Sequence, residues 1–192
     1  MKRLNMIAAF VLLSGIAFAQ TWNVDKAHAK LGFGITHLMI SEVDGTFKTF
    51  DATITSSKDD FSDAVFEISA DIASINTDNE NRDNDLKSET YFNAAKFPKL
   101  NFKSTSFKKV DGNKYKLAGD ITLKGVTKAI EVDVTVNGPI ERKGRDGVAK
   151  KVIGLKVSGS FKRTDFGIGG SGGAMLSEEV LIIANGEFSK QM

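Results

Sequence analysis

Apolar and polar residues alternate along most of this chain with the period of a β-strand. A period of two places one face of a strand against a core and the other face in water. The runs that follow this pattern are residues 31–35, 42–55, 66–72, 100–102, 115–123, 130–136 and 153–161. Residues 180–183 are apolar throughout and therefore predict a last strand that is covered on both faces.

Short turn sequences separate these runs. Asp111-Gly112-Asn113, Lys124-Gly125 and Arg145-Asp146-Gly147 are typical of tight hairpins. The chain thus predicts an all-β fold of about eight long strands, most of them joined by short connections. An up-and-down antiparallel barrel accommodates this pattern and leaves no exposed sheet edge. A two-sheet sandwich is the alternative, but the strands are longer than is usual for strands in general.

Residues 74–88 interrupt the alternation. Thr77 and Glu80 have the spacing of a capping box at the start of a helix. Asp83 and Lys87 stand four residues apart with the acid first, the favourable order for a pair on a helix surface. We therefore predict one short helical insertion near residues 77–92, set as a lid or plug on the barrel.

The first 19 residues predict a signal peptide. Lys2 and Arg3 precede an apolar run, and Ala17-Phe18-Ala19 is a small-residue cleavage site. The run is short for a membrane span, so an uncleaved anchor is the weaker alternative. The chain contains no cysteine, which excludes a lipoprotein anchor. Residues 20–192 then form one secreted domain.

Charge and composition narrow the function further. Lys2 and Arg3 are the charges of the leader, so the remaining 24 Lys and Arg balance the 24 Asp and Glu. A neutral domain gives no global argument for nucleic-acid binding. The absence of cysteine excludes disulfides, thiol catalysis and thiolate metal sites.

The apolar stripe that faces inward carries the functional signal. Small residues, Ala70, Gly119 and Gly159, interrupt it and either leave room for a ligand or relieve crowding at bends. The apolar character of the stripe favours a hydrophobic ligand in either case. The predicted lining residues are Phe33, Phe66, Ile68, Leu100, Phe102, Leu117, Ile121 and Phe161.

A few polar residues are candidates for the rim of such a cavity. His37 shares the inward parity of Phe33, and Arg163 continues the stripe that ends at Phe161. A cation there is paired with a carboxylate such as Asp83 or Asp165, solvated at a rim, or directed at an anionic ligand, and base rates favour the ion pair. The same three alternatives apply to Arg82, which lies in the helical insertion.

Other catalytic and metal-binding patterns are weak. The two histidines, His28 and His37, show no spacing for a shared metal site, and we predict none. The glycine run 167–173 lacks the Gly-Lys-Ser/Thr ending of a phosphate-binding loop and is typical of a mobile loop at a barrel mouth. No serine stands in a nucleophile-elbow pattern.

Seven segments, in order along the chain, resemble the YceI-like family of secreted polyisoprenoid-binding proteins. The segment at 74–88 matches its pattern Ser-Ile-x-Thr followed by Arg-Asp-x-His-Leu-x-Ser, except that Asp85 stands where the family usually has His. The other matching segments are Trp22-Asn23-Val24-Asp25 with His28, Phe33 with His37-Leu38, Gly45-Thr46-Phe47, Phe97-Pro98 with Phe102-Lys103-Ser104, residues 119–128 and residues 161–168.

The resemblance implies a lipocalin-like eight-stranded barrel in the periplasm that encloses an isoprenoid chain. It implies no catalytic step and no cofactor. Asp85 in place of His implies that a head-group contact of the relatives is absent or reversed in sign here.

Residues and resemblance together predict non-enzymatic binding, transport or storage of a polyisoprenoid lipid, such as a prenyl quinone or a polyprenyl phosphate derivative. Transient contact with a membrane is compatible with that function. One alternative is an enzyme acting on an isoprenoid or another small hydrophobic substrate, for which His37, Tyr115, Arg163 and Asp165 have inward parity. The other is a solid barrel that works through its outer surface.

Overall fold

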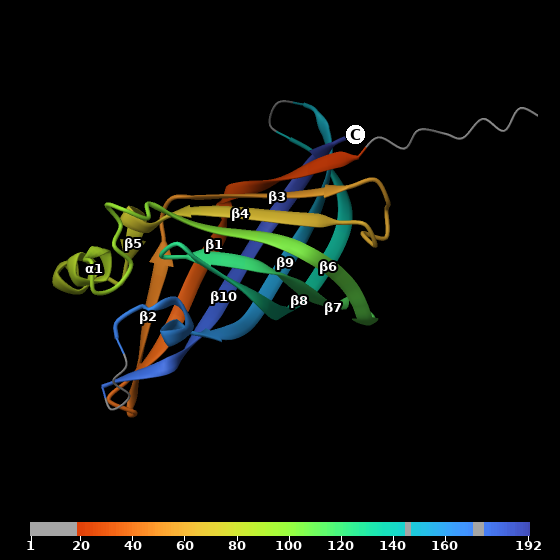
Figure 1. Cartoon of the computed structure of the whole chain (residues 1–192). Coiled ribbons are helices and arrows are strands. Elements are labelled where there is room, and N and C mark those ends of the chain that lie inside the picture. Colours follow the sequence, from red (N-terminus) through yellow and green to blue (C-terminus); the bar gives the residue numbers. More distant parts are fainter. Residues whose placement is uncertain (1–18, 145–146, 171–174) are drawn as a thin grey trace, which may run out of the picture.

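The computed structural model describes residues 19–144, 147–170 and 175–192 (Figure 1). The predicted leader lies outside these ranges except for Ala19, and the predicted turn at 145–147 lies outside them except for Gly147. The strands of the described chain are β1 (Gln20–His37), β2 (Ser41–Phe47), β3 (Phe50–Ser56), β4 (Val65–Asp71), β5 (Ile75–Asn76), β6 (Lys99–Asp111), β7 (Lys114–Leu123), β8 (Val126–Lys143), β9 (Ala149–Lys162) and β10 (Leu176–Gln191). Its helices are α1 (Glu80–Lys87) and the 3₁₀ turns η1 (Ile72–Ser74) and η2 (Arg163–Phe166).

The sheet closes into a barrel. Its strand order is β10-β9-β8-β7-β6-β4-β3-β1-β2-β5, and an additional pairing joins β10 to β1. Within the described residues, eight antiparallel strands therefore form the ring, while β2 and β5 lie beside it (Figure 1). The predicted lipocalin-like eight-stranded barrel is confirmed, and the alternative of a two-sheet sandwich is wrong.

Strand β1 changes partner along its length. Residues Gln20–Asn23 pair with β3, whereas Leu31–His37 pair with β2. The pattern over residues 42–55 suggested one run, but the chain turns at Lys48 and Thr49 and forms two strands. Because β2 and β3 do not pair with each other, the sheet splits at this side, and β5 and α1 lie beside the split (Figure 1).

The outer face of β10 is not covered, contrary to the prediction for residues 180–183. Val180 and Ile182 face inward, while Leu181 and Ile183 are exposed on the outside. These two side chains lie over Gly34 of β1, where a Cβ atom would come within 3.8 Å of both. The apolar outer residues therefore cover a glycine of the neighbouring strand and stay in contact with solvent.

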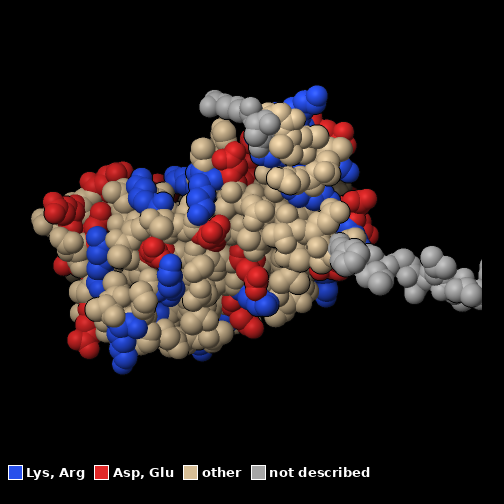
Figure 2. All heavy atoms as spheres, turned by 90° about the horizontal axis from the view of Figure 1, so that it is seen from above, with Lys and Arg blue, Asp and Glu red and all other residues tan. Residues whose placement is uncertain are grey.

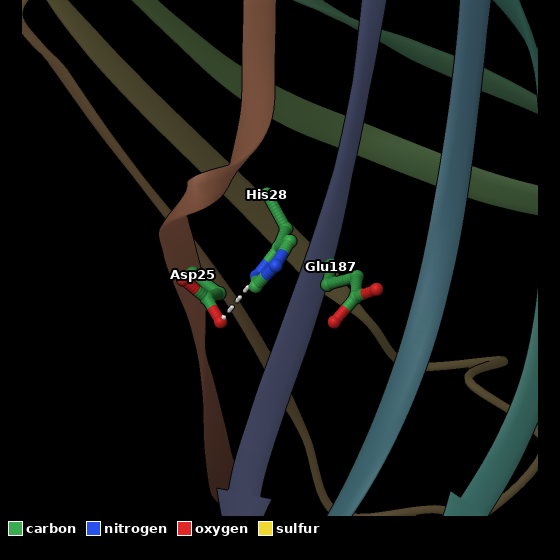
Figure 3. Close-up of side chains that lie close together, drawn as sticks. All are labelled: Asp25, His28 and Glu187. Carbon is green, nitrogen blue, oxygen red and sulfur yellow. Dashed lines mark hydrogen bonds and ion pairs between the residues drawn. The ribbon is translucent and has the colours of Figure 1, made fainter.

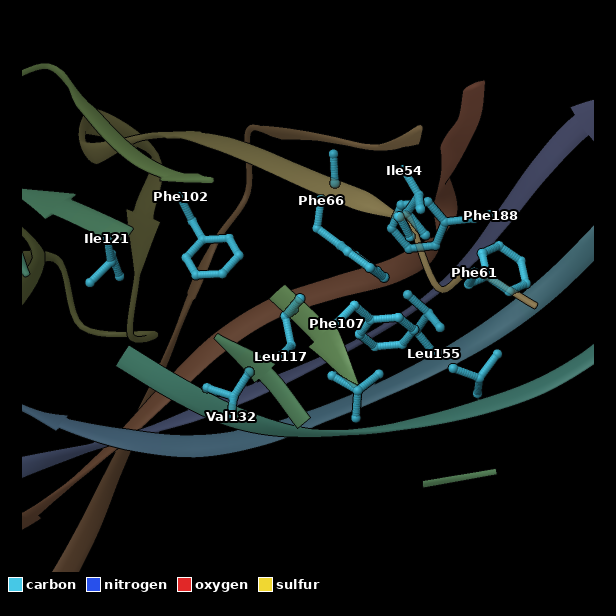
Figure 4. Packing of buried hydrophobic residues seen from close by; sticks show 14 of the residues in the cluster. Ile54, Phe61, Phe66, Phe102, Phe107, Leu117, Ile121, Val132, Leu155 and Phe188 are labelled. Atoms are coloured by element: carbon cyan, nitrogen blue, oxygen red, sulfur yellow. The ribbon is translucent and has the colours of Figure 1, made fainter. Parts of the chain in front are cut away.

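One end of the barrel is packed with aromatic side chains. The rings of Trp22 and Phe61 lie 5.5 Å apart. Those of Phe66 and Phe107, both labelled in Figure 4, lie 4.8 Å apart. Tyr115 stacks on Phe107 at 4.4 Å. Aromatic pairs at such distances add to the stabilisation from burial. This end of the barrel is solid.

Helix α1 forms within the predicted insertion but with a different cap. Asn79 is the N-cap, and its Oδ1 accepts a hydrogen bond from the backbone N–H of Arg82. The predicted capping box is wrong because Thr77 binds elsewhere: its backbone N–H and its hydroxyl both donate to the buried carboxylate of Asp83. The predicted surface pair of Asp83 with Lys87 is wrong for the same reason. Among the described residues, no helix has the length and hydropathy needed to cross a bilayer.

Candidate functional site

A cavity of about 640 Å³ occupies the part of the barrel that the aromatic end leaves open. Most of its walls come from inward-facing apolar residues of the barrel strands, and Leu86, Tyr91 and Phe92 close it from the side of α1. Ligand pockets in proteins measure roughly 300–1,000 Å³ and are mostly apolar. The cavity therefore has the size and the chemistry of a site for one hydrophobic molecule.

The structure brings the predicted site residues together around this cavity. The eight predicted lining residues border it, and so do the three predicted rim residues His37, Arg82 and Arg163. Their agreement follows from strand parity, because residues two apart on neighbouring barrel strands share the interior. That they contact a ligand stays a prediction.

The small residues of the inward stripe do not make the cavity. A Cβ atom on Gly119 would lie 2.5 Å from the ring of Phe102, and one on Gly159 would lie 2.6 Å from Val132 Cγ1. Ala70 is fully buried in a separate cluster with Phe47, Ile72 and Ile75. Neighbouring side chains thus fill the space beside these residues, and the interpretation as ligand room is wrong.

Sequence reasoning missed several residues of the wall. The cavity is also bordered by Gly32 of β1, Ala184 of β10 and Tyr91 of the helical insertion. Asp85 borders it too, and only the family resemblance had singled out that residue. The parity of β10 was a signal for Ala184, because it continues the inward set of Val180 and Ile182. Tyr91 had no such signal, since it lies in an irregular segment whose direction depends on tertiary contacts.

Arg163 is a structural residue of the wall. Arg163 is only 3% exposed, and strand β9 ends just before it at Lys162. Its guanidinium donates to backbone carbonyls, at 2.9 Å to Ser177, 2.8 Å to Ile168, 2.9 Å to Gly170 and 3.3 Å to Leu176. The expected ion pair is wrong, because Asp165 is exposed in turn η2 and Asp83 is bound to Thr77.

The loop that follows η2 is held in place as far as Gly170. Gly169 donates its backbone N–H to the carbonyl of Thr90, and its Cα lies so close to Tyr91 and Arg163 that a Cβ would come within 3.0 Å of both side chains. Its φ of +71° also favours glycine. Residues 167–170 of the predicted loop thus contact Thr90, Tyr91 and Arg163, and the mobility of the loop stays a prediction. Its remainder, 171–174, lies outside the described chain.

Arg82 has a different environment from Arg163. Its Nε donates to the Thr77 hydroxyl at 2.8 Å, and its Nη2 donates to the Thr77 carbonyl at 2.7 Å. Within the described chain, no protein group accepts from its Nη1, although the side chain borders the cavity. Thr77 thus fixes a guanidinium beside the cavity and leaves donors for a polar group of a ligand.

Asp25, His28 and Glu187 form a separate cluster on the outside of the barrel (Figure 3). An irregularity in the β1–β10 register between Val24 and Ala29 brings these side chains together, with one ligand atom of each within 4.8 Å of the others. They could offer one nitrogen and two carboxylates to a divalent cation. Arg142 Nη2 lies 4.0 Å from the Asp25 carboxylate and opposes such a cation. Sequence reasoning missed this cluster because it did not predict the irregularity.

The environment of His28 in this cluster changes the pKa of its imidazole. A 3.0 Å hydrogen bond to Asp25 and the charge of that carboxylate raise the pKa of His28 above its usual value of about 6.5. The hydrogen bond from His28 in turn lowers the pKa of Asp25. The pair therefore stabilises the fold between these two pKa values, and the effect is lost as pH falls through that of Asp25 or rises through that of His28. NMR titration should show the raised value for His28, and Asp25→Asn should lower it. An unchanged His28 pKa in that variant would contradict the assignment.

Charges of both signs are mixed on the outer surface. On the face seen in Figure 2, Lys and Arg side chains alternate with Asp and Glu. Several of them are joined in pairs, such as Lys103 with Glu67 at 2.8 Å and Lys116 with Asp133 at 2.8 Å. This face carries no basic stripe of the kind that binds nucleic acid.

Comparison with known proteins assigns the family. The sequence model of the YceI-like domain matches residues 22–188. The chain belongs to the YceI-like family. A UPF0312 protein of Staphylococcus aureus (strain N315) is 39% identical over 170 residues, which cover 86% of this chain and 95% of that protein. The resemblance found in the sequence is confirmed.

Solved structures share the barrel with this YceI-like chain. A YCEI protein of Campylobacter jejuni is 34% identical, with a TM-score of 0.65 over 88% of this chain and 96% of that one. BcnA of Burkholderia cenocepacia has a TM-score of 0.74 at 23% identity, covering 85% and 98% of the two chains. A polyisoprenoid binding domain from Saccharophagus degradans has a TM-score of 0.66 at 11% identity, covering 90% and 99%. The last two likenesses concern the fold alone.

Proposed function

We propose that this YceI-like protein binds a polyisoprenoid lipid in the barrel cavity and carries or stores it. The observation that carries the proposal is a 640 Å³ apolar cavity inside a closed barrel, with a guanidinium fixed beside it. A prenyl tail gains about 25 cal/mol for each Å² of apolar surface that it removes from water. The name of the Saccharophagus degradans domain, which shares the fold, points to the same class of ligand.

Binding without catalysis is the function that the wall supports best. Of the four groups that could serve an enzyme, His37 and Arg163 border the cavity, whereas Tyr115 stacks on Phe107 and Asp165 is exposed. The guanidinium of Arg163 is engaged by backbone carbonyls. General acid–base catalysis needs groups within hydrogen-bond reach of one reacting atom, and among these four candidates in the described chain only His37 and Arg163 border the cavity.

Arg82 is the proposed contact for the head group. Its free donors suit an oxygen acceptor, which a quinone carbonyl or a phosphate supplies. Asp85, three residues further along α1, also borders the cavity and puts a negative charge beside the same space. We therefore propose that a neutral head group is preferred to a highly charged one, because Asp85 repels anions.

Arg82→Met should weaken ligand binding about tenfold, because it removes the donors that face the cavity. It should also lower the free energy of unfolding by about 1–2 kcal/mol, because the buried Thr77 loses the donors to its hydroxyl and its carbonyl. Titration of a prenyl quinone by fluorescence or calorimetry measures the loss. Asp85→Asn should improve the binding of a polyprenyl phosphate, because it removes the negative charge that repels an anionic head group. Unchanged affinities in both variants would remove Arg82 and Asp85 from the head-group site.

The pattern of residues 1–19 supports export, and we propose the periplasm as the location. The decisive experiment uses protein expressed with its own leader and purified gently from that compartment. Native mass spectrometry followed by lipid extraction should detect a polyisoprenoid bound at one molecule per chain. Apo protein from this preparation, together with no thermal shift on addition of a prenyl quinone, would refute the proposed function.

A further inference from the structure

The hairpin between β1 and β2 ends in three consecutive exposed apolar residues. Met39 is 65% exposed and Ile40 is 84% exposed, and Leu38 precedes them. Met175, at 61% exposed, lies beside this tip, since its carbonyl accepts a 2.9 Å hydrogen bond from the backbone N–H of Leu38. Figure 1 shows the tip and the start of β10 extending together beyond the neighbouring strands. We call Leu38, Met39, Ile40 and Met175 the apolar tip.

The residues of this turn are not those that its backbone favours. Leu38 and Met39 have φ values of 51° and 59°, and the N–H of Ile40 donates to the carbonyl of His37. Positive φ at both central residues defines a type I′ turn, for which Asn-Gly is the preferred sequence. Large apolar side chains in this conformation are uncommon. Solvent exposure favours polar side chains at this turn, and the positive φ values favour Asn and Gly. The presence of large apolar residues despite both preferences points to a function for these residues.

The apolar tip continues into the cavity. Met175 itself borders the cavity, as do His37 and Leu176, the residues next to the tip on β1 and β10. Ile35 and Val43, one step further along the two strands of the hairpin, belong to the same wall. A hydrophobic molecule that moves from the tip to the cavity therefore stays in contact with apolar side chains.

We propose that the apolar tip inserts into the surface of a lipid bilayer and places the neighbouring end of the cavity against the membrane from which the ligand is taken. Four side chains at a projecting turn are too few for a specific protein–protein interface, which buries about 1,000 Å² or more. They suit a bilayer, because apolar side chains can enter the acyl region without a complementary surface. The docking step is independent of the ligand, whereas its role in uptake rests on the proposed function.

The charges around the tip select the kind of bilayer. Glu42, Glu178 and Glu179 are exposed on the strands next to the tip, and Lys162 stands opposite Glu179 in the register of β9 and β10. This excess of negative charge repels anionic lipids. The tip therefore docks on a zwitterionic surface, and salt weakens this docking little.

The test uses a variant that removes the apolar groups without harming the turn. Leu38→Asn with Met39→Gly supplies the sequence that a type I′ turn prefers, so the melting temperature should stay the same or rise. The matched control is Val110→Asn, because Val110 is 64% exposed at the β6–β7 hairpin, at the other end of β6 from α1 (Figure 1). The measurements are co-sedimentation with phosphatidylcholine vesicles, the rate of extraction of a long-chain prenyl quinone from them, and binding of a short-chain prenyl quinone in solution.

The double variant should lose at least tenfold in vesicle binding and in extraction rate, with short-chain quinone binding unchanged, and Val110→Asn should behave as the natural protein. Replacing part of the phosphatidylcholine by phosphatidylglycerol should weaken docking. Equal vesicle binding by the double variant would overturn the proposal, and so would a dimer that dissociates when the tip is changed. If neither the natural protein nor the variants bind the short-chain quinone, the proposed function is wrong. Co-sedimentation with vesicles still tests whether the tip docks on a bilayer.

Discussion

Ala184→Phe is expected to abolish uptake of a polyisoprenoid while the barrel remains folded. Ala184 borders the cavity and stands between Leu31 of β1 and Val157 of β9, two further wall residues. A phenyl ring there denies the tail about 100 Å² of apolar contact, which corresponds to roughly 2.5 kcal/mol or nearly a hundredfold in Kd. The stability change should stay below about 2 kcal/mol, because the ring enters space that is not filled by protein. Ligand titration and urea unfolding measure the two effects.

Gly119→Ala is the matched control for this prediction. Its added Cβ would lie 2.5 Å from the ring of Phe102 and 2.6 Å from the carbonyl oxygen of Lys103. In contrast to Ala184→Phe, this variant should lose about 1–3 kcal/mol in stability while its affinity for the ligand changes little. If Ala184→Phe and Gly119→Ala lost affinity and stability in the same proportion, the cavity would not be the binding site.

Arg163→Met should destabilise the protein by about 3–5 kcal/mol, with or without ligand. The substitution keeps most of the side-chain volume but removes the donors that serve the carbonyls of Ile168, Gly170, Leu176 and Ser177. The carbonyl of Ile168 lies in a buried environment and the other three are partly buried, so losing a charged donor leaves these acceptors with part or all of their desolvation cost uncompensated by a hydrogen bond. Urea unfolding of the ligand-free protein gives the size of the effect.

Two other arginines provide the comparison for Arg163. Arg142→Met removes an exposed guanidinium 4.0 Å from Asp25 and should change the stability by less than about 1 kcal/mol. Arg82→Met should lower the affinity and cost less stability than Arg163→Met, because it removes two hydrogen bonds to Thr77 and not four to backbone carbonyls. An Arg163→Met protein that melts as the natural protein does, yet binds lipid weakly, would make Arg163 a ligand contact instead of a structural residue.

The pattern along the chain was sufficient for the barrel and for the composition of its wall. Strand alternation is a local property, so residues such as Phe66, Ile68, Leu117 and Ile121 could be assigned to the interior before any contact was known. The tight turns at Gly112 and at Lys124-Gly125 were equally local. The helical insertion was predicted for the same reason, although its cap was not.

The structure corrected the predictions where several nearby groups compete for one hydrogen-bonding partner and the local backbone conformation decides between them. Thr77 has the spacing of a cap, yet the Asp83 carboxylate takes its hydroxyl and makes Asn79 the cap instead. Arg163 has an anionic neighbour in sequence, yet the turn η2 directs Asp165 to solvent and leaves the guanidinium to backbone carbonyls.

The sequence by itself determined the strand periodicity, the balanced charge of residues 20–192 and the family, because these can be read along the chain. Tertiary structure alone decided where the interior is hollow. Gly119 and Gly159 suggested empty positions, but the ring of Phe102 and the side chain of Val132 fill the space beside them, while Ala184 borders the cavity. Packing is a property of side chains from several strands at once, so the volume left between them cannot be read from the composition of any one strand.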